Sequence, residues 1–191
     1  AGIKKRGRIA SGPVAEKYAT VRSVAALDRA DVALLLLDAS TGLQSQDLHV
    51  AGSVIEAGKG LVVVMNKWDV VEKDGFTFDA AVGALRRQAP FLDFAPVLSI
   101  SALTGLRATK VLDAAIAASD ARRLRIPTGA LNRLVAEAVA RQEPAHSGSK
   151  RPKILYAAQA ATPPPTFVLF ARNAAQVHFS WQRFLENQIR D

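Results

Sequence analysis

Residues 61–69 have the sequence LVVVMNKWD, and this stretch decides the predicted fold. Five apolar residues, 61–65, follow one another without a break, and four of them are Leu or Val. A short, continuous apolar run of this kind is typical of a strand buried on both faces, as in a parallel sheet covered by helices. The run ends at Asn66, where polar residues begin. The sequence therefore predicts an α/β protein in which this is a central strand.

Asn66, Lys67 and Asp69 follow this strand in N-K-x-D spacing. In open α/β sheets, ligands bind at the carboxyl ends of the strands. A carboxylate there can accept hydrogen bonds from both the ring N1–H and the 2-amino group of guanine. Adenine has an acceptor at that ring nitrogen and lacks this amino group, so it would leave the carboxylate unpaired, which costs free energy. The lysine stem can lie across the base, and the asparagine can tie neighbouring loops together.

The alternative is that this strand simply ends in polar surface residues. The N-K-x-D spacing should occur by chance in roughly one or two chains in a hundred of this length. A second strand, predicted at 96–100, favours the guanine site because it ends at Ser101, Ala102 and Leu103. The two elements, about one βα unit apart, resemble the fourth and fifth sequence motifs of translation-factor-like GTPases. That resemblance implies that the backbone N–H of Ala102 binds O6 of guanine.

Around these strands, hydrophobic periodicity predicts a run of β-α-β-α-β-α. A buried strand is expected at 32–37, ending at Asp38, after a helix at 16–29. Further helices are expected at 45–58, 77–89 and 106–119. The first of these three is expected to be capped by Ser45 and ended by Gly58. Three βα units of a doubly wound parallel sheet are the predicted fold of this part.

The composition changes at 122–127, where three Arg and a Pro indicate a linker. The expected elements beyond it are a helix capped by Thr128, strands at 153–159 and 166–171, and a helix at 179–189. This order, α-β-β-α, predicts a small α+β domain. The predicted domains are therefore residues 1–121 and 122–191.

Composition limits the classes of function. The 191 residues contain no cysteine, which excludes disulfides and thiolate metal sites. The three histidines are scattered and do not indicate a metal site. No apolar run reaches the ~18 residues of a membrane span and no signal peptide is visible, so we expect a cytoplasmic protein without a membrane partner.

The net charge of +8 is unevenly distributed. Residues 1–120 hold 14 Lys and Arg against 13 Asp and Glu, whereas residues 121–191 hold 11 against 4, a balance of +7. A basic domain of this size commonly binds phosphate backbones, so RNA is one expected partner. The alternative is a basic surface that serves solubility alone.

The order of short segments along the whole chain closely resembles the bacterial double-GTPase family Der, also called EngA. The segments include RADVALLLLDA, NKWD, PFLDFAP, SALTG, RIPTGALN, PPTFVLF and HFSWQRFLENQIR. The resemblance implies that residues 1–121 are the second half of a second P-loop-type G domain and that residues 122–191 are a KH-like domain. It also implies GTP hydrolysis in the intact protein, a first G domain as partner, and a role in assembly of the large ribosomal subunit. Ribosomal RNA or the large ribosomal subunit is the expected partner of the basic C-terminal domain.

Residue by residue, the resemblance assigns GTP or GDP to a small set of positions. The expected nucleotide-binding residues are Asn66, Lys67, Asp69, Ser101, Ala102 and, from the third motif, Gly2. Residues 3–14 would then be the switch that senses the γ-phosphate. Ile3 falls where Ras-like proteins place the glutamine that orients water, and a hydrophobic side chain cannot do so.

Several family features do not occur in these 191 residues. There is no G-x-x-x-x-G-K-[ST] loop, and neither the third-motif Asp nor the switch I threonine is present. These groups hold the β- and γ-phosphates and Mg²⁺, which is expected in the intact protein. The chain alone is therefore predicted to be inactive, with no catalytic residue of its own. A second hypothesis remains open, in which the basic domain, lacking G-x-x-G, is a non-enzymatic module that binds ribosomal RNA or a neighbouring G domain.

Overall fold

The structure is a computed structural model that describes residues 25–72, 74–145 and 148–190. The described residues form two compact units, one ending at Ala121 and the other beginning at Arg122. The helix expected at 16–29 is described only over residues 25–29, which are helical. Gly2, Ile3 and the expected switch at 3–14 lie outside the described residues.

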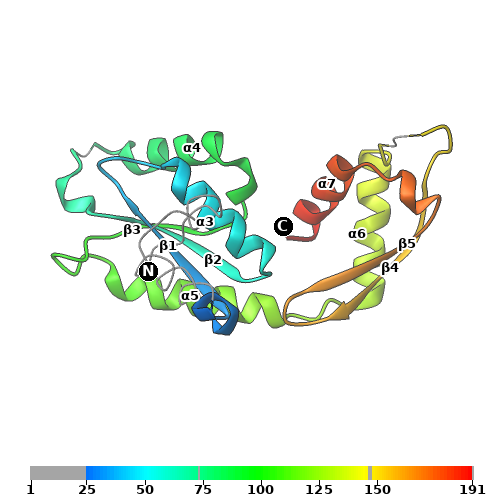
Figure 1. Cartoon of the computed structure of the whole chain (residues 1–191), viewed down its shortest axis with the longest axis horizontal. Helices are drawn as coiled ribbons and strands as arrows, with labels where there is room; N and C mark the ends of the chain where they lie inside the picture. Colours follow the sequence, from blue (N-terminus) through cyan, green and yellow to red (C-terminus); the bar gives the residue numbers. More distant parts are fainter. Residues whose placement is uncertain (1–24, 73, 146–147, 191) are drawn as a thin grey trace, which may run out of the picture. The chain divides into compact units, whose positions relative to one another are not determined.

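The first unit contains a three-stranded parallel sheet with its strands in the order β1-β2-β3 (Figure 1). Its elements are β1 (Val32–Asp38), α3 (Ser45–Glu56), β2 (Gly60–Asn66), η1 (Trp68–Val70), α4 (Thr77–Gln88), η2 (Pro90–Leu92), β3 (Val97–Ser99) and α5 (Ala108–Arg123). Each strand is followed by a helix, and β2 pairs with both β1 and β3. The predicted three βα units are confirmed.

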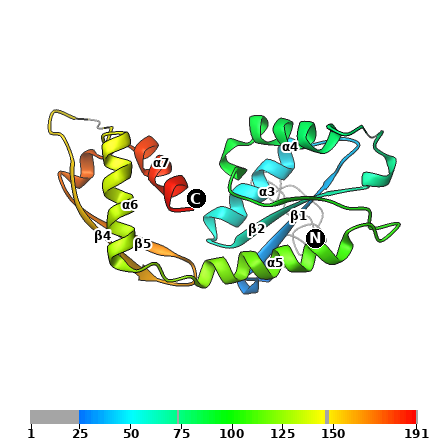
Figure 2. The same cartoon turned by 180° about the vertical axis from the view of Figure 1, so that it is seen from behind.

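Strand β2 is the centre of this unit, as its apolar run predicts. All five residues from Leu61 to Met65 are at most 6% exposed. Helices α3 and α4 lie on one face of the sheet and α5 on the other, as the two opposite views show (Figures 1 and 2). Because helices cover both faces, both sets of alternating side chains along β2 are buried, which explains its unbroken apolar sequence.

Strand β1 differs from the expectation of a fully buried strand. Leu35 and Leu37 are buried in the core beneath α3 and α4, but Leu34 and Leu36 are 41% and 57% exposed. The exposed pair lies on the α5 face of the sheet, next to Val62 and Val64 of β2. Since α5 packs over β2 through Val111, it leaves the neighbouring side chains of β1 uncovered. The prediction is therefore right for one face of β1 and wrong for the other.

Two helix ends also differ from the predictions. The N-cap of α3 is Gln44, one residue before Ser45, and its N–H donates to Oδ2 of Asp47 at 2.8 Å. Gly58 follows α3 with a φ of 64°, as its expected helix-ending role requires. Helix α5 extends to Arg123 and not only to 119, because nothing in the sequence SDARR stops a helix.

The second unit has the predicted α-β-β-α order. Its elements are α6 (Thr128–Arg141), β4 (Lys153–Ala161), β5 (Thr166–Arg172), η3 (Ala174–Gln176) and α7 (Phe179–Arg190). The N-cap of α6 is Pro127 and not the expected Thr128. Strands β4 and β5 form an antiparallel pair, and α6 and α7 pack on one face of it through Leu131, Val135, Trp181 and Leu185 (Figure 1). The predicted fold class, a parallel α/β unit followed by a small α+β unit, is confirmed.

Two polar side chains join the elements of the second unit. Asn132 of α6 donates to the carbonyl of Ala157 at 2.9 Å and accepts from its N–H at 2.8 Å. Gln159 of β4 bonds the segment before α6, accepting from the N–H of Ile126 and donating to the carbonyl of Leu124. Among the helices that the structure describes, none is both long and apolar enough to cross a membrane.

Candidate functional site

The carboxyl ends of the three parallel strands bring the polar residues of the first unit to one edge of the sheet. The pairing register sets Asp38, the last residue of β1, beside Asn66, the last residue of β2. On the other side of β2, Met65 pairs with Ser99 at the end of β3. Residues that are far apart in sequence therefore meet at the edge where ligands bind in open α/β sheets.

Hydrogen bonds join the loop after β2 to the loop after β3. The side-chain Oδ1 of Asn66 accepts from the backbone N–H of Ala102 at 2.9 Å. Two residues further along, the N–H of Trp68 donates to the carbonyl of Ile100, also at 2.9 Å. Asn66 thus ties neighbouring loops together, as predicted. The Ala102 N–H that is expected to donate to guanine O6 is engaged by Asn66 here, so a bound base would share or displace that contact.

Lys67 adopts a left-handed backbone conformation, with φ 61° and ψ 34°. Such a conformation is uncommon for a residue with a side chain and is held by its surroundings. Its ammonium Nζ lies 2.6 Å from Oδ2 of Asp38, while most of the lysine side chain stays exposed. The hydrogen bond with Asp38 raises the pKa of Lys67. The ion pair directs the lysine stem along the sheet edge.

Trp68, the variable residue of the N-K-x-D segment, anchors this loop in the core. It is 5% exposed and makes an edge-to-face contact with Phe78 of α4, with the ring centroids 5.9 Å apart. Asp69 follows it in η1 and is half-buried. Because Trp68 and Asp69 are neighbours in a short helix, their side chains point in different directions. Burial of the Trp68 indole therefore fixes the direction of the Asp69 side chain.

The loop after β3 is also held by its own contacts. Ser101 is fully buried, and its Oγ accepts from the N–H of Thr104 at 3.2 Å. Arg107, with a φ of 55°, donates from its guanidinium to Oγ of Ser99 at 2.7 Å. Ala102 lies between these contacts and is exposed. The loop therefore presents the backbone of Ala102 at the surface while the flanking serines stay inside.

The structure brings together five of the six predicted nucleotide-binding residues at this edge: Asn66, Lys67, Asp69, Ser101 and Ala102. The sixth, Gly2, lies outside the described residues. Sequence reasoning gave Asp38 and Trp68 no role in the site. The sequence did contain a signal for Asp38 as a site residue, because this carboxylate ends a second predicted parallel strand. Its pairing with Lys67 could not be predicted, because it depends on the register between the two strands.

The residue types at this edge do not match a metal site. Among residues 25–72, 74–145 and 148–190, no group of three or more His, Asp or Glu side chains could hold a metal ion. Chemically, the edge offers a carboxylate, an ammonium stem and a backbone N–H, which are groups that recognise a planar polar base.

Two family models match the chain. Residues 16–120 match the elongation factor Tu GTP-binding domain. Residues 125–191 match the KH-domain-like family that forms the C-terminal part of EngA bacterial GTPases. The two matches fall on the two structural units.

Curated relatives match along the whole chain. The GTPase Der of Alkaliphilus oremlandii is 43% identical over 191 residues, which is all of this chain and 43% of that protein. The GTPase Der of Chloroflexus aggregans is 44% identical over 192 residues, covering all of this chain and 42% of the relative. The chain therefore spans less than half the length of these relatives.

Proposed function

This chain belongs to the elongation factor Tu GTP-binding-domain family and ends in the KH-like unit of the EngA GTPases, and we propose that it supplies guanine recognition to a ribosome-assembly GTPase. The matches to GTPase Der confirm the resemblance found in the sequence. Since the chain covers 43% of the first relative, we propose GTP hydrolysis for the intact protein and not for these 191 residues alone.

One observation supports the proposed site most directly: the N-K-x-D loop and the S-A-L loop are hydrogen-bonded to each other at the carboxyl edge of the sheet. The proposed site needs a carboxylate from one loop and a backbone N–H from the other at the same time. The contact between Asn66 and Ala102 holds these two loops in register. A strand that merely ended in polar surface residues would not require it.

In the proposed complex, Asp69 accepts from N1–H and the 2-amino group of guanine. Lys67, oriented by Asp38, lies across the base, and the N–H of Ala102 donates to O6 of guanine while it remains shared with Oδ1 of Asn66. Ser101 holds the second loop from within, and Gly2 is proposed to meet the γ-phosphate. The ligand is GTP or GDP, and Mg²⁺ is expected to accompany it in the intact protein.

The cellular setting follows from the family. We propose a cytoplasmic protein in which a first G domain accompanies this chain and the large ribosomal subunit is the target.

A second candidate function rests on charge: residues 122–191 hold 11 Lys and Arg against 4 Asp and Glu. This basic unit would bind ribosomal RNA, either within the GTPase or as a module without enzymatic activity.

The test of the guanine site is Asp69→Asn in the complete protein, with the first G domain disabled. The substitution replaces one acceptor oxygen by an amide donor, which then faces the guanine 2-amino group. We expect GTP affinity to fall about a hundredfold, from a loss of about 3 kcal/mol. Xanthine has a carbonyl at that position, so XTP should compete better on the variant than GTP does.

Asp93→Asn is the matched control, because Asp93 is an exposed carboxylate paired with Arg86 away from this edge. It should leave both affinities unchanged. Unaltered GTP affinity and selectivity in Asp69→Asn would reduce the N-K-x-D segment to the polar end of a strand. The 191-residue chain alone should show no GTP hydrolysis above buffer in single-turnover assays, since it contains no phosphate-binding loop.

A further inference from the structure

The β4–β5 pair exposes two stacked aromatic rings. Tyr156 and Phe170 are cross-strand partners, and their ring centroids lie 4.1 Å apart with an interplanar angle of 12°. They are 49% and 40% exposed. Their neighbours along the strands, Ala157 and Leu169, belong to the core beneath α6 and α7. Because side chains alternate along a strand, the stacked pair lies on the opposite, uncovered face of the sheet.

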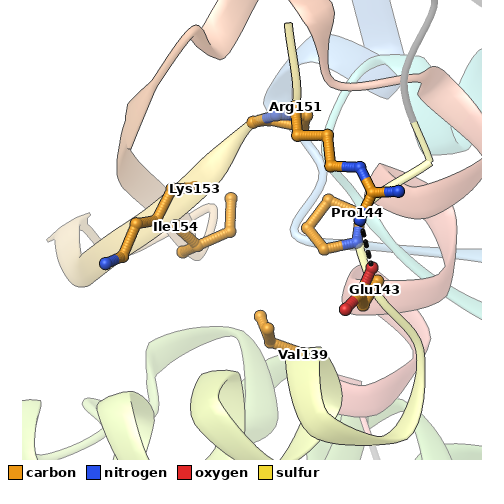
Figure 3. A pocket seen from close by; sticks show the side chains of 7 residues that line it. Val139, Glu143, Pro144, Arg151, Lys153 and Ile154 are labelled. Carbon is orange, nitrogen blue, oxygen red and sulfur yellow. Dashed lines mark ion pairs between the residues drawn. The ribbon is translucent and has the colours of Figure 1, made fainter.

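Basic side chains flank this aromatic pair on the same face. Lys153 and Arg172 are the next cross-strand partners on that side, and both are exposed. Neither β4 nor β5 contains an Asp or Glu. The nearby Glu143 lines a pocket of about 270 Å³ with Lys153, where it pairs with Arg151 at 3.8 Å (Figure 3). The face therefore combines an exposed π-surface with two positively charged side chains.

We propose that this face, defined by Tyr156, Phe170, Lys153 and Arg172, binds single-stranded RNA by base stacking. The proposal rests on the RNA-binding function proposed above for the basic unit, and it assigns that function to specific side chains. A nucleobase can extend an existing stack of two rings, and its phosphates can reach the Lys153–Arg172 pair. Because every base has a π-face, this contact tolerates most sequences.

A protein partner would fit this face less well. An exposed antiparallel face is ordinarily polar, and an apolar patch on it usually marks a binding surface. Lysine, however, is depleted in the centres of protein–protein interfaces, whereas aromatic rings beside Lys and Arg are typical of surfaces that bind single strands. The net charge of +7 on residues 122–191 would also attract RNA at long range.

The experiment measures binding of the 191-residue chain to a fluorescein-labelled ten-nucleotide oligouridine by anisotropy. The comparison ligand is the same oligomer with abasic riboses, which keeps the phosphates and removes the bases. We expect the base-bearing oligomer to bind at least about fivefold more tightly. The double variant Tyr156→Leu/Phe170→Leu keeps apolar surface but loses the rings, so it should bind both oligomers equally.

Three further variants separate the contribution of stacking from that of charge, and one fluorescence measurement checks folding. Phe179→Leu removes another exposed aromatic ring of the same unit, on α7, and should leave the preference for bases intact. Lys153→Gln/Arg172→Gln should lower the slope of log affinity against log salt concentration by about one to two units. Arg133→Gln removes a charge on α6, and it should preserve the preference for the base-bearing oligomer. Retained fluorescence of the buried Trp181 checks that each variant is folded.

The outcomes are distinct. Equal binding of both oligomers by the unmodified chain, with steep salt dependence, would keep the charge-based RNA function but overturn the stacking site. A base preference that persists in Tyr156→Leu/Phe170→Leu would likewise overturn the stacking site and keep the charge-based RNA function. Absence of any salt-dependent binding would overturn both the stacking site and the RNA-binding function of the basic unit. A protein would then be the favoured partner of this face. None of these results bears on the guanine site, whose test is the GTP and XTP competition.

Discussion

The ammonium Nζ of Lys67 lies 2.6 Å from Oδ2 of Asp38, so the lysine of the N-K-x-D segment is paired with the aspartate that ends the neighbouring parallel strand. The other carboxylate oxygen accepts from the N–H and the hydroxyl of Ser40, at 3.0 and 2.6 Å. Both oxygens are therefore fixed, and the lysine has a defined anchor before any base arrives. Such preorganisation reduces the entropy lost on binding.

This pair predicts an unusual titration. The hydrogen bonds from Lys67 and then Ser40 lower the pKa of Asp38 from 3.8 to about 2. Since the ionised form is the one stabilised by folding, the contribution of Asp38 is complete above about pH 4 and is lost as the pH falls towards 2. NMR titration of the Asp38 carboxyl should show the low midpoint, and Lys67→Met should move it back towards 3.8.

Lys59→Met is the control for that titration, because Lys59 donates to the carbonyl of Asp28 and not to Asp38. It should leave the midpoint of Asp38 where it is. An Asp38 midpoint near 3.8 in the unmodified chain would show that the ion pair is absent in solution.

The contact between Asn66 and Ala102 predicts a local change in hydrogen exchange. Asn66→Ala removes the acceptor of the Ala102 N–H, so this amide should exchange about fivefold faster, from a hydrogen bond of about 1 kcal/mol. Asn66→Asp keeps an acceptor oxygen and should preserve the protection. Equal exchange in all three proteins would mean that the two loops are joined by other contacts. The amide is followed by NMR.

Adjacent residues of β1 should lose very different amounts of stability on truncation. Leu35 is 6% exposed and packs beneath α3 and α4, so Leu35→Ala should cost the first unit about 2–5 kcal/mol of unfolding free energy. Leu36 is 57% exposed, so Leu36→Ala should cost less than about 1 kcal/mol. Urea unfolding followed by Trp68 fluorescence, in a Trp181→Phe background, measures both. Similar losses at the two positions would contradict the exposed face of β1.

Asn132 should be a main stabiliser of the second unit. Its side chain bonds both backbone groups of Ala157 and also the carbonyl of Thr128. Asn132→Ala leaves these groups without that partner and should cost about 2–4 kcal/mol. Asn187→Ala, at an exposed position of α7, should change stability by less than about 0.5 kcal/mol. The measurement is urea unfolding followed by Trp181 fluorescence in a Trp68→Phe background.

Local pattern alone predicted most of the fold. The continuous run at 61–65 indicated a strand covered on both faces, and these five residues of β2 are buried because helices cover both sides. The βα alternation and the later α-β-β-α order were equally visible, since helix and strand periods are properties of short segments. The positions of Asn66, Lys67 and Asp69 after a buried strand were sufficient to place them at the edge of a sheet.

The sequence by itself therefore determined the elements, their order and the edge at which the site would lie. Tertiary structure alone decided which side chains meet: Lys67 with Asp38, Trp68 with Phe78, and Tyr156 with Phe170. It also decided that Leu34 and Leu36 of β1 are exposed. The physical reason is that these contacts depend on strand register and on which helix covers which strand. Both are fixed by packing between segments that are distant in the chain.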